Sequence, residues 1–150
     1  MKSLPINYVS KGWGYESWIA NNDQYCGKLL FFKKGKHCSW HYHEKKHETF
    51  YVQSGKLIVV YSEEDCLNPN QHVTIRGTNV NEISSLISTW TAPTIADAPP
   101  AAAVAILEPG DVFEVPVGLR HAMCGMLDTE MFEFSTHHED EDSFRVLKGD

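Results

Sequence analysis

The amino-acid sequence predicts a mainly β protein, because most of the chain reads as short strands separated by turn signals. Few stretches show the roughly 3.6-residue spacing of apolar side chains that an amphipathic helix requires. The candidate strands are rich in β-branched and aromatic residues, which strands favour. Many short strands joined by tight turns are typical of a sandwich or a barrel, where closing the sheet removes its exposed edges.

The strands are expected between turns with recognisable chemistry. Ser54-Gly55 separates two strand patterns as a tight hairpin would, and Pro109-Gly110 suits the central positions of a type II turn. The predicted strands are residues 16–19, 27–33, 38–43, 48–53, 56–61, 72–76, 103–107, 112–115, 121–123 and 129–135.

Length and composition indicate a single domain over residues 1–150. A chain of 150 residues, 42% of them hydrophobic, can bury one core but is too short for two ordinary domains. We expect a core at about 26–136, a loop insertion at about 62–100 and a C-terminal tail at 137–150. Within the insertion, residues 81–90 suit either a short helix or a strand.

Charge and cysteine content narrow the possible partners. The formal net charge is −7, and no segment gathers Lys and Arg into a basic stripe, so neither nucleic acid nor an anionic membrane is expected as a partner. The four cysteines form no CxxC pair and are expected to be reduced thiols.

The N-terminus predicts a cytoplasmic protein. Pro5 and Asn7 stand where a signal peptide would carry its apolar stretch. The longest apolar run, residues 98–107, contains two prolines and is far shorter than the about 20 residues of a membrane-spanning helix.

Clustered histidines give the first indication of chemistry. His41 and His43 are two residues apart, so on a strand both imidazoles point to the same side. That alternation suits two ligands of one metal ion. His37, near a turn, and His47, on the opposite side from Glu48, are expected to be bystanders.

Glu48 can complete this set if a turn follows His43. Residues 43–46 are polar enough to form one, and Glu48 would then lie on a neighbouring strand with Phe50 and Val52 on its inward face. Two imidazoles and one carboxylate leave open positions on a metal for a substrate or oxygen.

These residues resemble the two motifs of the cupin family. The first motif matches at every fixed position as Gly35, five residues, His41-Tyr42-His43, four residues, Glu48, six residues and Gly55. The second matches as Gly110, five residues, Pro116-Val117-Gly118, two residues and His121, although Gly125 stands where the family often has Asn.

The resemblance implies an all-β cupin double-stranded β-helix, a jelly-roll barrel. It also implies one divalent transition metal ion held by His41, His43, Glu48 and His121. Imidazole and carboxylate ligands suit Mn, Fe, Ni and Zn alike. The alternative is a cupin that has lost its metal, but four polar side chains buried without a ligand would be costly.

A narrower similarity points to sugar phosphates. The segments Gly12-Trp13-Gly14-Tyr15-Glu16, Tyr25-Cys26-Gly27-Lys28-Leu29 and Ser135-Thr136-His137-His138 resemble parts of the mannose-6-phosphate isomerase type of cupin. A Gln of that family is replaced by His41 here. The similarity implies a sugar or sugar phosphate as the small-molecule substrate.

Several charged residues are candidates for handling such a substrate. Lys28, His137 and Arg145 are predicted to bind an anionic group, which Arg matches with parallel hydrogen bonds. Lys46 and Glu133 are the predicted proton carriers, and Glu48 and Glu130 are alternatives. The alternative for Lys28 is a solvent-exposed side chain, and the alternative for His137 and Arg145 is a solvent-exposed tail. The acidic residues 139–142 would also repel an anionic ligand bound beside them.

Three functions follow from this reading. The first is a metal-dependent isomerase or epimerase of a sugar or sugar phosphate, in which the metal polarises oxygens and a base moves a proton. The second is an Fe(II)-dependent dioxygenase, and the third is a non-catalytic module that binds a carbohydrate or another small molecule. The resemblance also implies a homodimer formed through residues up to about 27.

Overall fold

The structure is a computed structural model that describes residues 3–63, 73–74 and 102–150. These residues form strands β1 to β12 and one short 3-10 turn, η1 (Asp140–Asp142), which confirms the predicted all-β class. Over the described residues, no helix has the length and apolar character needed to cross a membrane.

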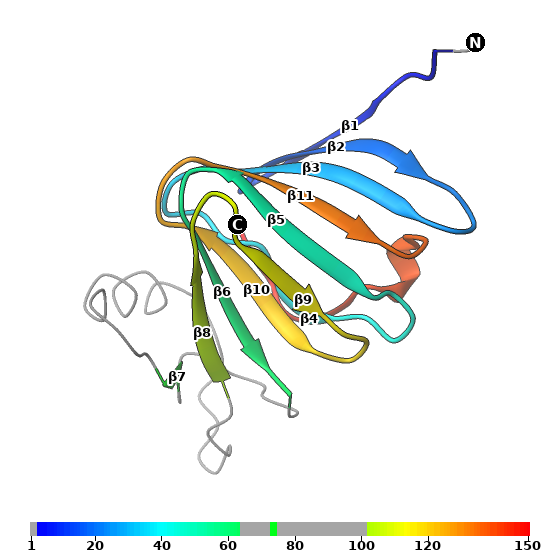
Figure 1. Cartoon of the computed structure of the whole chain (residues 1–150). Coiled ribbons are helices and arrows are strands. Elements are labelled where there is room, and N and C mark those ends of the chain that lie inside the picture. The colour runs from blue at the N-terminus through cyan, green and yellow to red at the C-terminus, as the bar shows by residue number, and fades with distance from the viewer. Residues whose placement is uncertain (1–2, 64–72, 75–101) are drawn as a thin grey trace.

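Two sheets face each other, as predicted for a jelly roll (Figure 1). Sheet A has the order β1-β2-β3-β11-β5-β9, with bounds Asn7–Lys11, Gly14–Asn21, Cys26–Phe32, Thr129–Ser135, Glu48–Ser54 and Val112–Val115. Sheet B has the order β12-β4-β10-β6-β8-β7, with bounds Phe144–Leu147, Trp40–Tyr42, Arg120–Gly125, Leu57–Ser62, Ala102–Leu107 and Val73–Thr74. Neighbouring strands are antiparallel, except for the parallel pair of β7 and β8.

Strand alternation decides which side chains of sheet A enter the core. In β3, Lys28, Leu30 and Phe32 are buried while the residues between them are partly exposed. In β5, Glu48 and Phe50 follow the same pattern. The inward face of sheet A is therefore apolar toward one end and charged toward the other.

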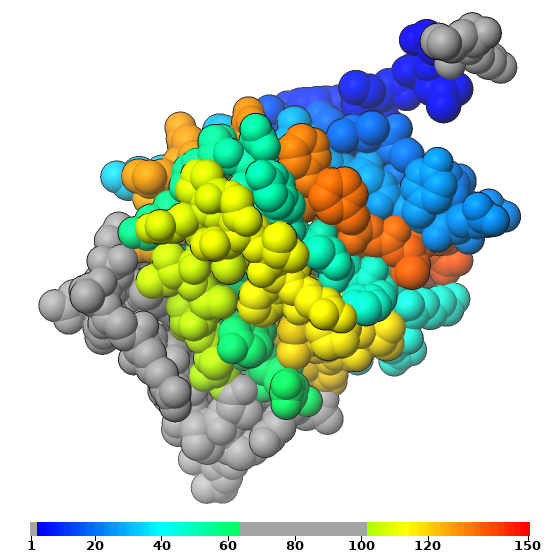
Figure 2. Space-filling model, viewed as in Figure 1, coloured from blue at the N-terminus to red at the C-terminus, as the bar shows by residue number. Residues whose placement is uncertain are grey.

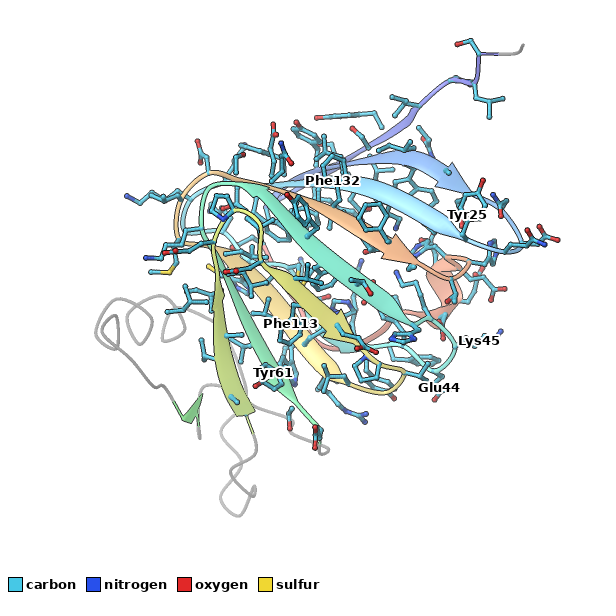
Figure 3. All side chains as sticks on the ribbon, in the orientation of Figure 1. Tyr25, Glu44, Lys45, Tyr61, Phe113 and Phe132 are labelled. Atoms are coloured by element: carbon cyan, nitrogen blue, oxygen red, sulfur yellow. The ribbon has the colours of Figure 1, made fainter. Side chains whose placement is uncertain are left out.

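One open side of the sandwich is closed by aromatic side chains. The ring of Tyr61 on β6 meets the ring of Phe113 on β9 edge to face, with 5.2 Å between centroids (Figure 3). These strands belong to different sheets, so this contact ties sheet A to sheet B on the side away from β1.

A turn is present at Ser54-Gly55, because β5 ends at Ser54 and β6 begins at Leu57. The prediction of a tight hairpin is wrong, since β5 belongs to sheet A and β6 to sheet B, and the chain crosses between the sheets here. Gly55 has a φ of +89°, a conformation that glycine adopts at low cost. A Cβ atom at this position would collide with the carbonyl oxygen of Asp128, so the turn requires glycine for space as well.

Both ends of the chain add strands that the sequence did not predict. β1 pairs with β2 along the edge of sheet A, before the predicted start of the core. The prediction of a C-terminal tail at 137–150 is wrong, since β12 pairs with β4 at the edge of sheet B. The register of β12 shifts between Arg145 and Leu147, and such an irregular strand lacks the strict alternation that marks strands in a sequence.

Only parts of the predicted insertion at 62–100 can be compared. Ser62 ends β6, and Val73–Thr74, within the predicted strand 72–76, forms β7. The predicted helix or strand at 81–90 lies outside the described residues. β4 is shorter than the predicted strand 38–43, because the chain leaves sheet B after Tyr42.

Candidate metal centre

Three histidines from sheet B converge inside the sandwich. His41 on β4 is the direct partner of His121 on β10, and His43 follows the end of β4. One ring nitrogen from each histidine lies within 4.8 Å of the other two. Strand pairing therefore brings together side chains that are 80 residues apart, at a spacing suited to one metal ion.

The other ring nitrogen of each histidine is held by the backbone. The Nδ1 atoms of His41, His43 and His121 lie 2.8, 2.9 and 2.9 Å from the carbonyl oxygens of Ser39, Asp142 and Leu119. A carbonyl only accepts, so each Nδ1 carries the hydrogen and donates it. Each neutral ring then directs the lone pair of Nε2 inward, as a metal ligand must.

Glu48 reaches the same point from sheet A. Its Oε2 atom lies 3.5 Å from Nε2 of His43 and 3.2 Å from Nε2 of His121. The sequence placed Glu48 on a strand neighbouring that of His43, but β5 belongs to the opposite sheet. The segment 43–47 is thus a crossing between sheets, and the four side chains meet across the interior.

The burial of these atoms fits a bound cation. Nε2 of His43, Nε2 of His121 and Oε2 of Glu48 are buried and make no hydrogen bond within the described part of the chain. Leaving such atoms unsatisfied costs about 1–3 kcal/mol each. A metal ion among them would satisfy all three at once.

The protonation states agree with metal binding. Burial lowers the pKa of His43 to about 4. Burial and the neighbouring imidazoles also hold the pKa of His41 well below its usual value. Burial alone would raise the pKa of Glu48, but the ammonium group of Lys46 together with His121 and His43 outweighs it and holds this pKa well below its usual range. Two neutral imidazoles and a carboxylate are the forms that ligate a divalent metal.

A buried ion-pair cluster adjoins the histidines. Nζ of Lys46 lies 2.9 Å from Oε1 of Glu48 and 3.2 Å from Oε2 of Glu133, and it also lies 2.9 Å from Nδ1 of His138. Burial lowers the pKa of Lys46, but the two carboxylates outweigh it and raise that pKa above its ordinary value. Burial and the charge of Glu48 raise the pKa of Glu133 to about 7.

These groups open into one cavity of about 660 Å³. Its lining includes the charged side chains of Lys28, Lys46, Glu48 and Glu133, together with His41 and His43. The volume lies in the range of small-molecule sites, about 300–1,000 Å³. The centre therefore has the room and the polar groups to hold a small polar ligand beside a metal.

Asp142 organises the turn that carries His43 toward Glu48. Its buried carboxylate accepts hydrogen bonds from the backbone N–H groups of Glu44, Lys45 and Lys46, at 2.9 to 3.0 Å. The backbone carbonyl oxygen of Asp142 accepts a hydrogen bond from Nδ1 of His43. Glu44 and Lys45 lie at the outer end of this turn (Figure 3). The role of Asp142 in this turn was not predicted from the sequence, where the residue belongs to an acidic run that reads as solvated.

The remaining candidates divide into two groups. Lys28 and Arg145 line the cavity, Lys28 deep within it and Arg145 at the exposed end of β12. His137 does not line this cavity and directs Nδ1 to the carbonyl of Asn22, while its neighbour His138 does line it. Glu130 alternates away from Glu133 on β11 and is also absent from the lining.

The two histidines expected to be bystanders lie outside the cluster. His47 is exposed and pairs with Glu114 at 2.8 Å, which confirms its outward orientation. His37 is buried, with Nδ1 2.8 Å from the carbonyl of Cys38. Of the cysteines, Cys26, Cys38 and Cys124 are free thiols, as predicted, and Cys66 lies outside the described residues.

The fold and the three-histidine cluster define a metal-binding jelly-roll protein. A family model described as Cupin matches residues 27–147, most of the chain, and the protein belongs to the cupin family. The resemblance found in the two sequence motifs is thereby confirmed. No curated protein sequence shows significant similarity to the chain.

Solved structures with the same fold are distant in sequence. KdgF from Halomonas sp. aligns with a TM-score of 0.58 and 14% identity over 90% of this chain and 91% of its own. The capsular polysaccharide assembling protein CapF from Staphylococcus aureus aligns with a TM-score of 0.62 and 17% identity over 97% of this chain. A variant of Bacillus subtilis oxalate decarboxylase aligns with a TM-score of 0.63 and 13% identity over 93% of this chain.

The likeness to these structures extends to the fold alone. The chain covers 35% of CapF and 30% of oxalate decarboxylase, so it corresponds to about a third of each.

Proposed function

We propose that the protein is a metal-dependent isomerase or epimerase of a sugar or sugar phosphate. His41, His43, His121 and Glu48 would hold one divalent transition metal ion, which, when bound, polarises carbonyl and hydroxyl oxygens. The observation that carries the proposal is the placement of Lys46 and Glu133 in the same cavity as His41, His43 and Glu48. Proton transfer needs an acid–base group beside a polarised oxygen, and here the two features adjoin.

Glu133 is the proposed base. As a carboxylate it takes a proton from the carbon next to a carbonyl group, and the electron pair of the C–H bond moves toward the carbonyl oxygen. In epimerisation the carboxylic acid returns the proton to the same carbon and the electron pair comes back to it. In isomerisation the proton of the adjacent hydroxyl group moves to the former carbonyl oxygen, the hydroxyl-bearing carbon becomes the new carbonyl, and Glu133 returns its proton to the former carbonyl carbon. A pKa of about 7 suits both halves of this cycle near neutral pH.

Lys46 positions this base. Its ammonium group contacts Glu133 and Glu48 together, so it fixes the orientation of both carboxylates and offsets their mutual repulsion. Because Lys46 is 3% exposed, water competes little for these contacts.

The first test measures metal content and then turnover. Elemental analysis of the parent beside His43→Ala should give about one metal ion per chain in the parent and a loss of metal in the variant. The metal-loaded protein is then screened with aldoses, ketoses, sugar phosphates and, given the neighbouring folds of CapF and oxalate decarboxylase, with saccharides and small carboxylic acids. A parent that takes up no metal under any loading condition would sink the catalytic proposal.

The screen also separates the other two functions. Substrate-dependent oxygen uptake with Fe(II) would favour a dioxygenase, because the same ligands leave room for substrate and oxygen. Stabilisation by a sugar with no turnover would favour a binding module. Isomerisation under anaerobic conditions, lost in Glu133→Gln with metal retained, is the outcome expected here.

We further propose a homodimer formed through the N-terminal strands. Leu4, Ile6 and Tyr8 are at least 60% exposed. The chain before β1 stands away from the body of the molecule (Figure 2). β1 is an edge strand, so its free backbone groups can pair with another strand. Light scattering should give twice the chain mass for the parent and a shift toward the monomer for Ile6→Asp/Tyr8→Asp.

A further inference from the structure

Lys28 carries a buried charge that the protein leaves incompletely satisfied. The side chain is 1% exposed, and its Nζ atom lies 3.8 Å from Oε1 of Glu16, beyond hydrogen-bond distance. Its other close neighbour is the ring of Trp18, 4.2 Å from Nζ to the centroid. Among the residues that the structure describes, none accepts a hydrogen bond from this ammonium group.

The acidic groups around Lys28 are already engaged. Glu16 also pairs with Lys11 at 3.7 Å and accepts from Nε1 of Trp18 at 3.3 Å. Glu133, the direct strand partner of Lys28, directs Oε2 to Lys46 instead. An ammonium group so deeply buried requires an acceptor, and the open space beside it is the cavity.

The charge of the whole cavity points the same way. Five basic side chains line it, Lys11, Lys28, Lys46, Arg145 and Lys148, against five acidic ones, Glu16, Glu48, Glu133, Asp140 and Asp150. These charges balance, and a bound divalent ion would add two positive charges. The metal-loaded cavity is therefore expected to favour an anionic ligand.

The location of Lys28 fixes where the anionic group lies. Glu48, Glu133 and Lys28 occupy the neighbouring strands β5, β11 and β3 of sheet A. Two interstrand spacings separate the metal-ligating strand from that of Lys28, about 10 Å. A ligand that reaches from one to the other is an extended or cyclic compound with its charge at the end remote from the metal.

We propose that Lys28 binds an oxyanion group of the substrate, a phosphate or a carboxylate, remote from the oxygens that approach the metal. This inference rests on the proposed function for the metal end alone. It assigns the substrate class: a sugar phosphate or sugar acid rather than a neutral sugar. Lys28 thereby acts in substrate specificity, while proton transfer remains with Glu133.

The test compares three ligands that differ only at the end expected to meet Lys28. Glucose, glucuronate and glucose 6-phosphate are titrated calorimetrically into the metal-loaded parent, into Lys28→Met and into Lys56→Met. Lys56 lies outside the cavity, paired with Glu108 at 3.7 Å, so its variant controls for the lost charge. The parent and Lys56→Met should bind one of the anions at least ten-fold more tightly than glucose, and Lys28→Met should lose that preference.

Which anion is preferred distinguishes a phosphate from a carboxylate. Retention of the preference in Lys28→Met, or equal binding of all three ligands by the parent, would overturn the inference. If Lys28→Met does not fold, protection of the parent by inorganic phosphate and by acetate decides instead. A rise in the melting temperature of the parent with either anion that is absent in Lys28→Gln supports the site, and no rise with either anion overturns it.

Binding is measured without turnover, so the two proposals fail separately. A parent that binds the anion through Lys28 but isomerises nothing contradicts only the proposed reaction. A parent that isomerises a neutral sugar equally well with and without Lys28 contradicts only the anion site.

Discussion

Sheet B and sheet A both contribute buried polar side chains to the candidate site, but the two sets of side chains have different hydrogen-bonding and ionic partners. On sheet B, His41, His43 and His121 each use one nitrogen on a backbone carbonyl. The Nε2 atoms of His43 and His121 make no hydrogen bond within the described residues. On sheet A, Glu48 and Glu133 meet the ammonium group of Lys46.

The difference separates two roles of buried polarity. The neutral imidazoles of sheet B are incomplete without an added cation, whereas the charges of sheet A mostly neutralise each other within the protein. Glu48 links the histidines to the charged cluster, because Oε1 contacts Lys46 while Oε2 faces His43 and His121. Removing a group from sheet B should therefore affect metal binding, and removing one from sheet A should affect stability and proton transfer.

The largest effect on metal binding is expected for His121→Ala, which removes one of the three histidines that converge at the candidate metal centre. His121 is fully buried and is the strand partner of His41, so no other described side chain can take its place. Metal affinity should fall at least about 100-fold, measured by competition with a chromogenic chelator. His47→Ala, at an exposed position, should bind metal as the parent does. Equal affinity in His121→Ala would show that the metal is held elsewhere.

A comparably large effect, on folding rather than on metal binding, is expected from Lys46→Met, which removes the cation shared by Glu48 and Glu133. Removing the shared cation leaves Glu48 and Glu133 buried beside each other, and breaking a buried pair in this way costs about 3–5 kcal/mol. Urea unfolding of the metal-free protein should show this loss. The double variant Lys46→Met/Glu133→Gln should recover part of it. A loss below about 1 kcal/mol, as for an exposed pair, would mean that the cluster is not a buried ion pair.

A smaller effect is expected from Asp142→Asn, which weakens the hydrogen bonding of the turn between His43 and Glu48. An amide nitrogen replaces one acceptor oxygen, so one backbone N–H of the turn at 44–46 loses its partner, at about 1–2 kcal/mol. Because this turn carries His43 toward Glu48, metal affinity should fall as well. Glu141→Gln, an exposed neighbour in the same acidic run, serves as the control for charge. Equal stability and metal affinity in the two variants would contradict the role of Asp142.

The smallest effect is expected from a change in pH, because His43 and Glu133 change the free energy of unfolding in opposite directions. His43 has a lowered pKa of about 4, so the unfolded chain binds more protons between pH 4 and 6.5, and this contribution to stability is lost as the pH falls through that window. Glu133 has a raised pKa of about 7, so its contribution is lost as the pH rises from 4.5 through 7.

The two slopes, each up to about 1.4 kcal/mol per pH unit, offset each other between pH 4.5 and 6.5. Glu133→Gln removes one of them. The free energy of unfolding of the metal-free variant should therefore rise more steeply with pH in this range than that of the parent. Equal slopes would contradict the buried, titrating state of Glu133.

Local patterns predicted much of this molecule. Alternation placed Glu48, with Phe50 and Val52, on an inward face, and the strands Val112–Val115 and Thr129–Ser135 were predicted at their observed bounds. The spacing of His41 and His43 pointed to a shared ligand position. These features depend on a period of two residues or on a fixed turn, and both are readable within a short window.

Other parts of the site escaped the sequence for a physical reason. Asp142 lies in an acidic run, and β12, which follows it, is a short and irregular strand without a regular alternating pattern. They are ordered by contacts with β4 and with the turn at 44–46, including a hydrogen bond between His43 and a residue 99 positions away. Contacts of this kind come from the pairing of distant strands and are invisible to local periodicity.

The sequence by itself determined the strand class, the inward faces and the identity of the three histidines, because side-chain chemistry and residue spacing are local properties. Only the tertiary structure decided that Glu48 approaches from the opposite sheet, that Lys46 bridges it to Glu133, and that Lys28 receives no hydrogen-bond acceptor from the described residues. Those outcomes depend on which strands become neighbours and in what register, and that choice is made by burial and hydrogen bonding over the whole chain.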